Sequence, residues 1–244
     1  MTSRHSGVSL TELMISLCLS SLLMTALIQT YLNSKRQNTH TLQILEQNFE
    51  LQLVSELIRD SVRSAGFTPC IGINHLITRD RRGKPGHPVA VDLHPGKPQS
   101  FMISRMGEDF ATVLKQLAPA RLLVAGGRVF DSRHPVVIAD CLHAEIHFVA
   151  SSHKTPEGWI ISLTKPLDFN YALPFYLGEW LEERFSVEKN IQGKPALFYD
   201  TLHREELTDL IDGLDSQQES SLLRTTLRLA AGGEIVLETQ VRTP

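Results

Sequence analysis

At 244 residues, with 42% hydrophobic and 21% charged residues, the chain has the composition of a globular protein of one or two domains. Its formal net charge of −3 excludes a general electrostatic attraction to nucleic acid or to anionic lipid. The apolar residues are unevenly spread, however. They concentrate in the first 30 residues, and the remainder has the pattern of a soluble domain.

The chain begins with a short polar leader, MTSRHSG, and continues from Val8 to Ile28 with about 21 mostly apolar residues. A helix of this length crosses the roughly 30 Å hydrocarbon core of a bilayer. The following segment, LIQTYLNSK, has no A-x-A-like site, and the apolar run is longer than the core of a usual secretory signal. These features favour a retained anchor. Its orientation stays open, because Arg4 lies before the run and Lys35 and Arg36 lie after it.

The apolar run is predicted to continue into a long amphipathic helix. Neither Gly nor Pro occurs from Val8 to Ala65, so the helix is expected to be uninterrupted and on the order of 85 Å long, with Gly66 as its C-cap. After Thr39 the apolar residues recur at spacings of three and four, which marks one helix face that should lie on a soluble domain. This face comprises Leu42, Leu45, Phe49, Leu53 and Leu57, widened by Val54, Ile58 and Val62.

The order of these features resembles the class III signal of type IV pilins. The shared features are a short basic leader that ends in Gly, then V-S-L-T-E-L-M, then an apolar run that passes into a long amphipathic helix. In that family a membrane aspartyl peptidase cuts after the Gly, and the new amino terminus is N-methylated. The resemblance places the cut between Gly7 and Val8 and makes Glu12 the fifth mature residue. Val8 stands where the family usually has Phe.

Glu12 is an acid within an apolar run. An isolated carboxylate or ammonium in hydrocarbon is costly, and each is relieved by pairing with the other. In pilin fibres the corresponding Glu is thought to meet the amino terminus of a neighbouring subunit, so the resemblance implies that Glu12 takes part in subunit assembly. The alternative is a Glu near the membrane interface that extends into water.

From Phe67 onward, prolines and glycines divide the chain into short segments typical of strands and turns. Alternating residues in 223–229 and 235–241, separated by an AGGE turn, predict a β-hairpin. Short helices are expected at Asp109–Leu117 and Arg204–Gly213. The predicted class is α+β and type IV pilin-like, with the long helix packed on an antiparallel β-sheet domain. The other expected strands are Ser100–Arg105, Ala120–Val124, Val136–Ala139, Ala144–Ala150, Trp159–Thr164, Arg184–Glu188 and Leu197–Tyr199.

Three further stretches are similar to minor pilins of the PilW type. LIRDSVRSAGFTPC, at 57–70, has their order of Arg-Asp, then Ala-Gly-aromatic, then Cys at the end of the helix. VVIADCLHAEIHFV, at 136–149, resembles their central strand, and GKPALFYDTLHREELTDLIDGLDSQQ, at 193–218, resembles a later segment of strand, short acidic helix and Asp-Gly. The PilW type is related to the J-type pseudopilin of type II secretion, and the two cysteines outside the apolar run favour PilW.

Those cysteines are Cys70 and Cys141, and the third, Cys18, lies within the apolar run, where a thiol behaves as a small hydrophobe. In an oxidising compartment Cys70 and Cys141 are candidates for a disulfide. The sequence leaves open whether their Cα atoms come within bridging distance.

His143, Glu145 and His147 alternate, so on a strand they would share one face with Cys141. This pattern is a candidate metal site. The favoured interpretation is a solvated polar face, because the opposite side is apolar and should face the core. That side comprises Leu142, Ala144, Ile146 and Phe148.

Two charged clusters are likewise interpreted either as binding sites or as solvated surface. Asp209, Asp212 and Asp215 suggest calcium, but their spacing does not match the D-x-[DN]-x-[DN]-G loop, and acidic helix faces are common. A basic loop would suit phosphates, but four charges without interleaved aromatic residues are typical of a solvated loop. Its residues are Arg79, Arg81, Arg82 and Lys84.

The chain has no G-x-S-x-G, G-x-x-x-x-G-K-[ST], H-E-x-x-H or C-x-x-C motif, so no enzyme, metal or cofactor is expected. The interpretation is a minor pilin of a type IV pilus with a leader at 1–7, a helix at 8–66 that spans the inner membrane at about 8–28, and a periplasmic β-rich domain at 67–244. Its partners would be other minor and major pilins, the prepilin peptidase and inner-membrane lipid, with nucleic acid disfavoured. The alternatives are a J-type pseudopilin, or a single-pass periplasmic binding protein or enzyme with an uncleaved anchor.

Overall fold

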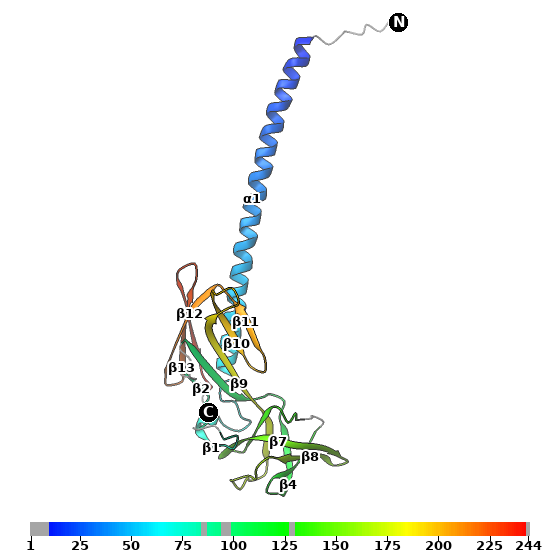
Figure 1. Ribbon diagram of the computed structural model, residues 1–244, viewed down its shortest axis with the longest axis vertical. Coiled ribbons are helices and arrows are strands. Elements are labelled where there is room, and N and C mark those ends of the chain that lie inside the picture. Colours follow the sequence, from blue (N-terminus) through cyan, green and yellow to red (C-terminus); the bar gives the residue numbers. More distant parts are fainter. Residues whose placement is uncertain (1–9, 84–86, 94–98, 127–129, 243–244) are drawn as a thin grey trace. The chain divides into compact units, whose positions relative to one another are not determined.

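The structure is a computed structural model that describes residues 10–83, 87–93, 99–126 and 130–242. One long N-terminal helix, α1 (Leu10–Arg63), is followed by a domain of mostly antiparallel strands, which confirms the α+β class (Figure 1). The chain divides into two compact units, 1–50 and Leu51–Pro244. The last turns of α1 therefore belong to the same unit as the strands.

The long helix is uninterrupted, as the sequence predicts. It ends at Arg63, and the chain changes direction at Gly66. Gly66 has φ of +70°, a region that favours glycine because it has no Cβ. Its N–H donates to the carbonyl of Ser104 (2.8 Å), and a Cβ built there would lie 2.7 Å from the Cβ of Ala90. Only glycine allows the chain to leave the helix this close to the neighbouring strand.

The last turns of α1 contribute one line of side chains to the core. Val54, Ile58 and Val62 lie four residues apart and are at most 5% exposed. Part of the predicted face is therefore wrong, because Leu42, Leu45, Phe49 and Leu53 are each more than half exposed. The spacing of apolar residues predicts a wide apolar face on the helix. Only the side chains at one edge of this face, those that contact the strands, are buried.

The core around these turns is built from a sheet of antiparallel pairs in the order β2–β3–β9–β10–β11. Phe101 and Phe185 stack across it with ring centroids 5.1 Å apart. The strands are β2 (Val91–Asp92), β3 (Ser100–Met106), β9 (Phe175–Lys189), β10 (Pro195–Asp200) and β11 (Arg204–Thr208).

A second sheet joins the same core. Its strands are β12 (Ile211–Glu219), β13 (Leu222–Leu229) and β14 (Glu234–Gln240), all antiparallel. Leu223, Leu227 and Leu237 are buried together with the line of α1 side chains. The pairing of β13 with β14 confirms the predicted hairpin.

The remaining strands close into a small antiparallel barrel. Within the described residues, hydrogen-bonded pairs run β9–β4–β5–β8–β7–β6 and return to β9. The interior holds its own apolar cluster, which includes Ile138, Ile161 and Leu177. The new strands are β4 (Ala111–Ala118), β5 (Arg121–Val124), β6 (Pro135–Ala139), β7 (His143–Thr155) and β8 (Gly158–Leu163).

Two features connect the barrel to the sheet beside α1. The first half of β9 pairs with β4 and β6, and its second half pairs with β3 and β10. The strand β6 and the part of β7 that pairs with it are buried on both faces, since Val137 and Ile146 face the core beside α1 whereas Val136 and Ile138 face the barrel interior. A short strand, β1 (Ile77–Asp80), follows a 3₁₀ turn, η1 (Ile73–His75), and pairs in parallel with β7.

Every segment expected as a strand is a strand, usually longer than predicted, whereas the two expected short helices are wrong. Residues 109–117 fall largely in β4, and residues 204–213 fall in β11 and the start of β12. In β4 the pairing with β5 shifts register twice, so its apolar residues do not alternate and mimic a helical spacing. In both segments pairing with neighbouring strands decides the structure over local propensity.

Candidate functional site

The first turns of α1 present apolar side chains on all sides. The apolar part of the helix is long and apolar enough to cross a membrane, a test that a signal sequence also passes, and none of its residues is buried within the structure. Over 10–34 the sequence contains a single Asp, Glu, Lys or Arg residue, Glu12. The large exposed apolar side chains here are Leu10, Leu13, Met14, Ile15, Leu17, Leu19, Leu22, Leu23, Met24, Leu27, Ile28, Tyr31 and Leu32.

The hydroxyl groups in this segment bond within the helix itself. The hydroxyl of Ser16 donates to the carbonyl of Leu13 (2.9 Å), and that of Thr25 donates to the carbonyl of Ser21 (2.8 Å). Ser20, Ser21 and Thr30 bond in the same way. These side chains therefore need no water and are compatible with an apolar environment.

Glu12 lies in the first turn of α1 and is exposed. The predicted cleavage position, Gly7 and Val8, lies outside the described residues. The structure thus places the acid of the predicted assembly site at the start of an exposed apolar helix.

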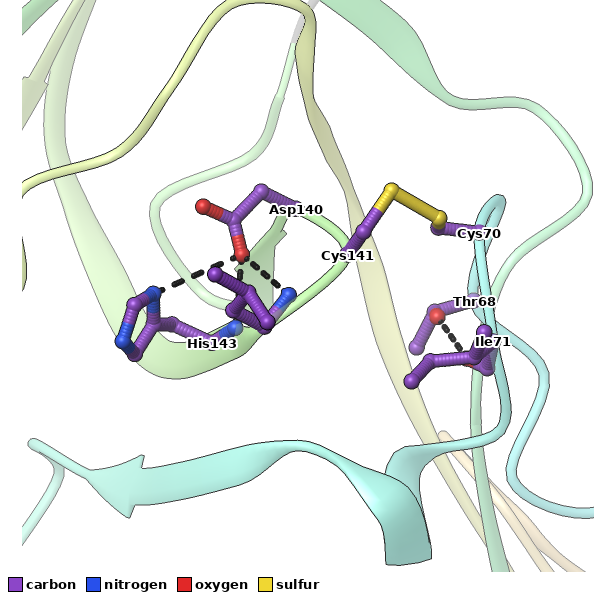
Figure 2. The surroundings of a disulfide bond; sticks show 7 residues. Thr68, Cys70, Ile71, Asp140, Cys141 and His143 are labelled. Atoms are coloured by element: carbon purple, nitrogen blue, oxygen red, sulfur yellow. Dashed lines mark hydrogen bonds and ion pairs between the residues drawn. A yellow bond between two sulfur atoms is a disulfide. The ribbon is translucent and has the colours of Figure 1, made fainter.

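Cys70 and Cys141 form a disulfide, with their Cα atoms 5.2 Å apart (Figure 2). Cys70 follows the end of α1, and Cys141 lies in the turn between β6 and β7. Asp140 fixes this turn, because its Oδ1 accepts from the N–H groups of Leu142 (2.7 Å) and His143 (2.6 Å). The disulfide therefore joins the segment after α1 to the barrel.

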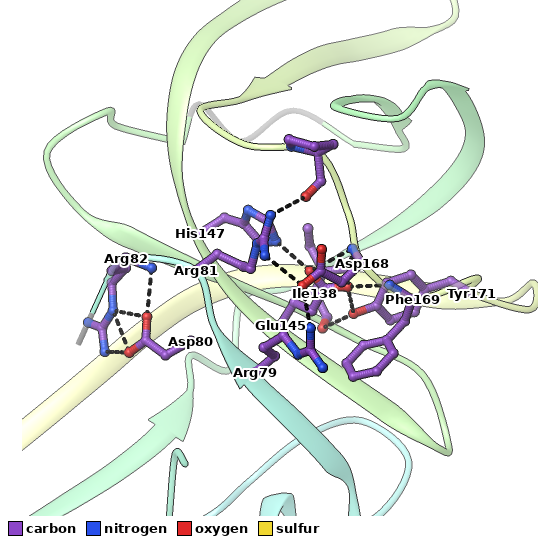
Figure 3. Close-up of polar contacts among 11 residues, drawn as sticks. Arg79, Asp80, Arg81, Arg82, Ile138, Glu145, His147, Asp168, Phe169 and Tyr171 are labelled. Atoms are coloured by element: carbon purple, nitrogen blue, oxygen red, sulfur yellow. Dashed lines mark hydrogen bonds and ion pairs between the residues drawn. The ribbon is translucent and has the colours of Figure 1, made fainter. Parts of the chain in front are cut away.

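Glu145 and His147 form a buried polar pair, which corrects the prediction of a solvated face. Both side chains are 0% exposed, and His147 Nε2 lies 3.0 Å from Glu145 Oε2 (Figure 3). The register explains their burial, since Glu145 lies opposite Ile138 and His147 opposite Val136, both of which face the barrel interior. The Nδ1 of His147 has no hydrogen-bond partner in the described part of the chain.

The Glu145 carboxylate holds the loop that precedes β9. Its Oε1 accepts from the N–H groups of Asp168 (3.0 Å) and Phe169 (2.9 Å) and from the Tyr171 hydroxyl (3.2 Å). Burial, the largest influence, raises the pKa of Glu145, but the hydrogen bonds from His147, Phe169 and Asp168 and the attraction to His147 outweigh it. The pKa of Glu145 is therefore lowered, and the pair is an anchor for this loop.

The expected basic loop is instead a set of ion pairs beside the same network. Arg79 and Arg81 both contact Asp168 Oδ2, at 2.9 and 2.6 Å (Figure 3). Arg82 is buried and pairs with Asp80 (2.7 Å) and Glu182 (2.6 Å). Burial, the largest influence, lowers the pKa of Arg82, but hydrogen bonds and attraction to these two acids raise it overall. The prediction of a solvated loop is wrong for Arg82, whereas Arg79 is exposed although it is ion-paired, and Lys84 lies outside the described residues.

The structure does not assemble the candidate metal or calcium ligands. In the ranges that it describes, no three His, Cys, Asp or Glu side chains are grouped so as to hold a metal ion. Cys141 is bonded to Cys70, and Asp212 pairs with Arg228 (2.8 Å). The acidic residues 209–215 lie on and before β12, so the expected acidic helix face does not form.

The pattern His-x-Glu-x-His does not by itself reveal the loop anchor at Glu145. Its neighbours are apolar, so the pattern predicts the solvated side of a strand. The missed signal lies in the partner strand, PVVIA at 135–139, which has no polar residue on either face. A strand without a polar face is typical of one that is covered on both sides, and the residues of β7 that pair with this strand are covered with it.

No protein-family model, curated protein or solved structure matches the chain. Its function therefore has to be argued from the geometry described above.

Removing the disulfide should destabilise the domain. Cys70→Ser and Cys141→Ser each open a loop of 71 residues, whose closure restricts the unfolded chain by about 4 kcal/mol. We expect a matching loss in the free energy of unfolding, measured by urea denaturation of the detergent-solubilised chain without reductant. Cys18→Ser is the control and should change nothing. Two free thiols at Cys70 and Cys141 in the intact mass of periplasmic material would contradict the bridge.

The Glu145 anchor should make the domain sensitive to acid. Because the folded pKa of Glu145 lies below its ordinary value of 4.5, its contribution is present above about pH 4.5 and is lost as pH falls through the folded value. Glu145→Gln leaves backbone N–H groups facing an amide, so we expect a loss of about 1–3 kcal/mol at pH 7 and a shallower acid limb.

The measurement is the urea midpoint between pH 3 and 7. The matched control is Glu157→Gln, in the exposed turn between β7 and β8, which should behave as the unmodified chain. An unchanged midpoint for Glu145→Gln at pH 7 would rule out the anchor.

Proposed function

We propose that the protein is a minor pilin of a type IV pilus, which joins other minor pilins in a complex that primes assembly of the fibre. The observation that carries the proposal is α1. It is one continuous helix of 54 residues whose first half is exposed and apolar and whose last turns are embedded in a β-rich domain. The chain itself offers no core for the first half, so lipid or neighbouring helices have to cover it.

The polar groups of α1 support the same proposal. The hydroxyls between Ser16 and Thr30 bond to carbonyls of the same helix, and Glu12 is the one acidic or basic residue of the sequence over 10–34. A carboxylate at that position is costly for an isolated helix in lipid and is stabilised by a positive partner. In an assembly of pilin-like subunits, that partner is the amino terminus that cleavage after Gly7 creates on a neighbour.

The disulfide bears on the location of the domain. Disulfides persist in oxidising compartments, and the bridge between Cys70 and Cys141 suits a domain in the periplasm. In this proposal α1 is inserted in the inner membrane before it enters a fibre. The mechanism is association by lateral packing of helices, neutralisation of charge at Glu12 and contacts between the β-rich domains.

Processing by a prepilin peptidase is the decisive test. We expect co-expression with the peptidase to remove Met1–Gly7 and to add a methyl group to Val8, both read from the intact mass. Gly7→Val changes the residue after which this class of peptidase cuts and should prevent the loss, whereas Ser6→Ala, one residue earlier, should be processed normally.

An identical mass with and without the peptidase would exclude the pilin class. It would favour a single-pass periplasmic binding protein or enzyme with an uncleaved anchor. A processed chain that assembles with the proteins of a secretion system, and not with those of a pilus, would identify the J-type pseudopilin.

A further inference from the structure

The strand β14 has an unpaired edge. It lies at one end of the sheet β12–β13–β14, and among the described strands it pairs only with β13. The N–H of Val241 donates to Ser221 (2.7 Å), and the carbonyl of Gly233 accepts from Leu229 (3.0 Å), so the odd-numbered residues direct their backbone groups at β13. Backbone groups alternate in direction along a strand, so the even-numbered residues of β14 direct theirs outward.

This edge lacks several of the features that usually prevent strand pairing, and its charged residues are two acids, Glu234 and Glu238. Its sequence, EIVLETQ, has no Pro, Gly or Lys, and its pairing with β13 has no register shift. The other edges differ. β2 has two residues, β1 has four, and both β11 and β12 have a register shift in their pairing. Among the strands described, β14 therefore presents an unpaired edge that is regular over its whole length.

We propose that β14 is an interface for a second copy of this chain. Two β14 strands pair antiparallel about a two-fold axis, so that two three-stranded sheets become one continuous sheet. In this arrangement the outward backbone groups of each copy hydrogen-bond to those of the other. The proposal does not depend on the proposed function.

The charges on β14 select one register. With the axis at Leu237, Glu234 lies opposite Gln240 of the copy, and Val236 lies opposite Glu238 of the copy. No acid then faces another acid. With the axis at Val236, Glu234 lies opposite Glu238 of the copy. With the axis at Glu238, this residue lies opposite Glu238 of the copy. Like charges directly opposite each other destabilise a strand pair. Of these three registers, which pair most of β14, only the one with its axis at Leu237 keeps the acids apart, and this is the self-complementary register.

Val236 is the position that tests the interface. Its backbone groups point outward, and its side chain is 47% exposed on the face away from the core. Val236→Pro removes the outward N–H without removing a bond to β13, and such a proline is tolerated on an edge strand. Two N–H groups are lost in each dimer, so we expect the dissociation constant to rise at least roughly tenfold. Val236→Thr keeps the strand and is the control.

A matched pair of charges tests the register. In the proposed pairing Val236→Glu places an acid opposite Glu238 of the copy twice in each dimer, and the dissociation constant should rise roughly tenfold. Val236→Lys places a base there, and this variant should associate as tightly as the unmodified chain or more tightly. Within one chain the diagonal neighbours of residue 236 on β13 are Arg224 and Arg228, which favour Glu over Lys. Weaker association of Val236→Glu would therefore not come from a damaged fold.

The measurement is sedimentation velocity of the full chain in detergent micelles over a range of concentrations. The proposal expects a concentration-dependent dimer that Val236→Pro and Val236→Glu weaken and that Val236→Lys and Val236→Thr preserve. A chain that stays monomeric would overturn it, and so would a dimer that Val236→Pro leaves unchanged, since α1 would then hold the copies together. Equal weakening by Glu and Lys would overturn the self-complementary register.

Discussion

The contrast between the two ends of α1 is the constraint on which the account depends. At its C-terminal end, Val54, Ile58 and Val62 are buried against the strands, and this packing orders the last turns of the helix. Before those turns, large apolar side chains remain exposed along the helix, and burying such surface contributes about 25 cal/mol per Å². Nothing within the described chain covers them. That free energy is gained only when something outside the described chain covers the surface.

The β-rich domain is held together by elements shared between its two cores. β9 belongs to the barrel in its first half and to the sheet beside α1 in its second half. β6 and β7 place apolar side chains in both cores, and the disulfide links the segment after α1 to the turn between them. Forces on the end of α1 are therefore transmitted to the barrel through backbone pairing and a covalent bond.

The sequence was sufficient for the features that depend on local pattern. Without Gly or Pro between Val8 and Ala65 the helix continues, and strict alternation around the AGGE turn specifies the last hairpin. It was insufficient where a distant partner decides the outcome. Glu145 and His147 have the alternation of a solvated face, and only the pairing with β6 shows that this face is inside the barrel. Arg79 and Arg81 likewise pair with Asp168, which is 89 and 87 residues away in the chain. Arg82 pairs with Glu182, 100 residues away, as well as with the nearby Asp80.

The central claim is that Glu12 is retained in an apolar helix because it meets a positive charge on a neighbouring subunit. It is tested most directly by counting surface pili in cells whose only copy of the protein carries Glu12→Ala or Glu12→Gln. Ser16→Ala, one turn further along, is the control, because its hydroxyl bonds only to its own helix. The account predicts that both Glu12 variants are cleaved by the peptidase but leave the cells with few pili, whereas Ser16→Ala gives normal numbers. Normal piliation with either Glu12 variant would contradict it.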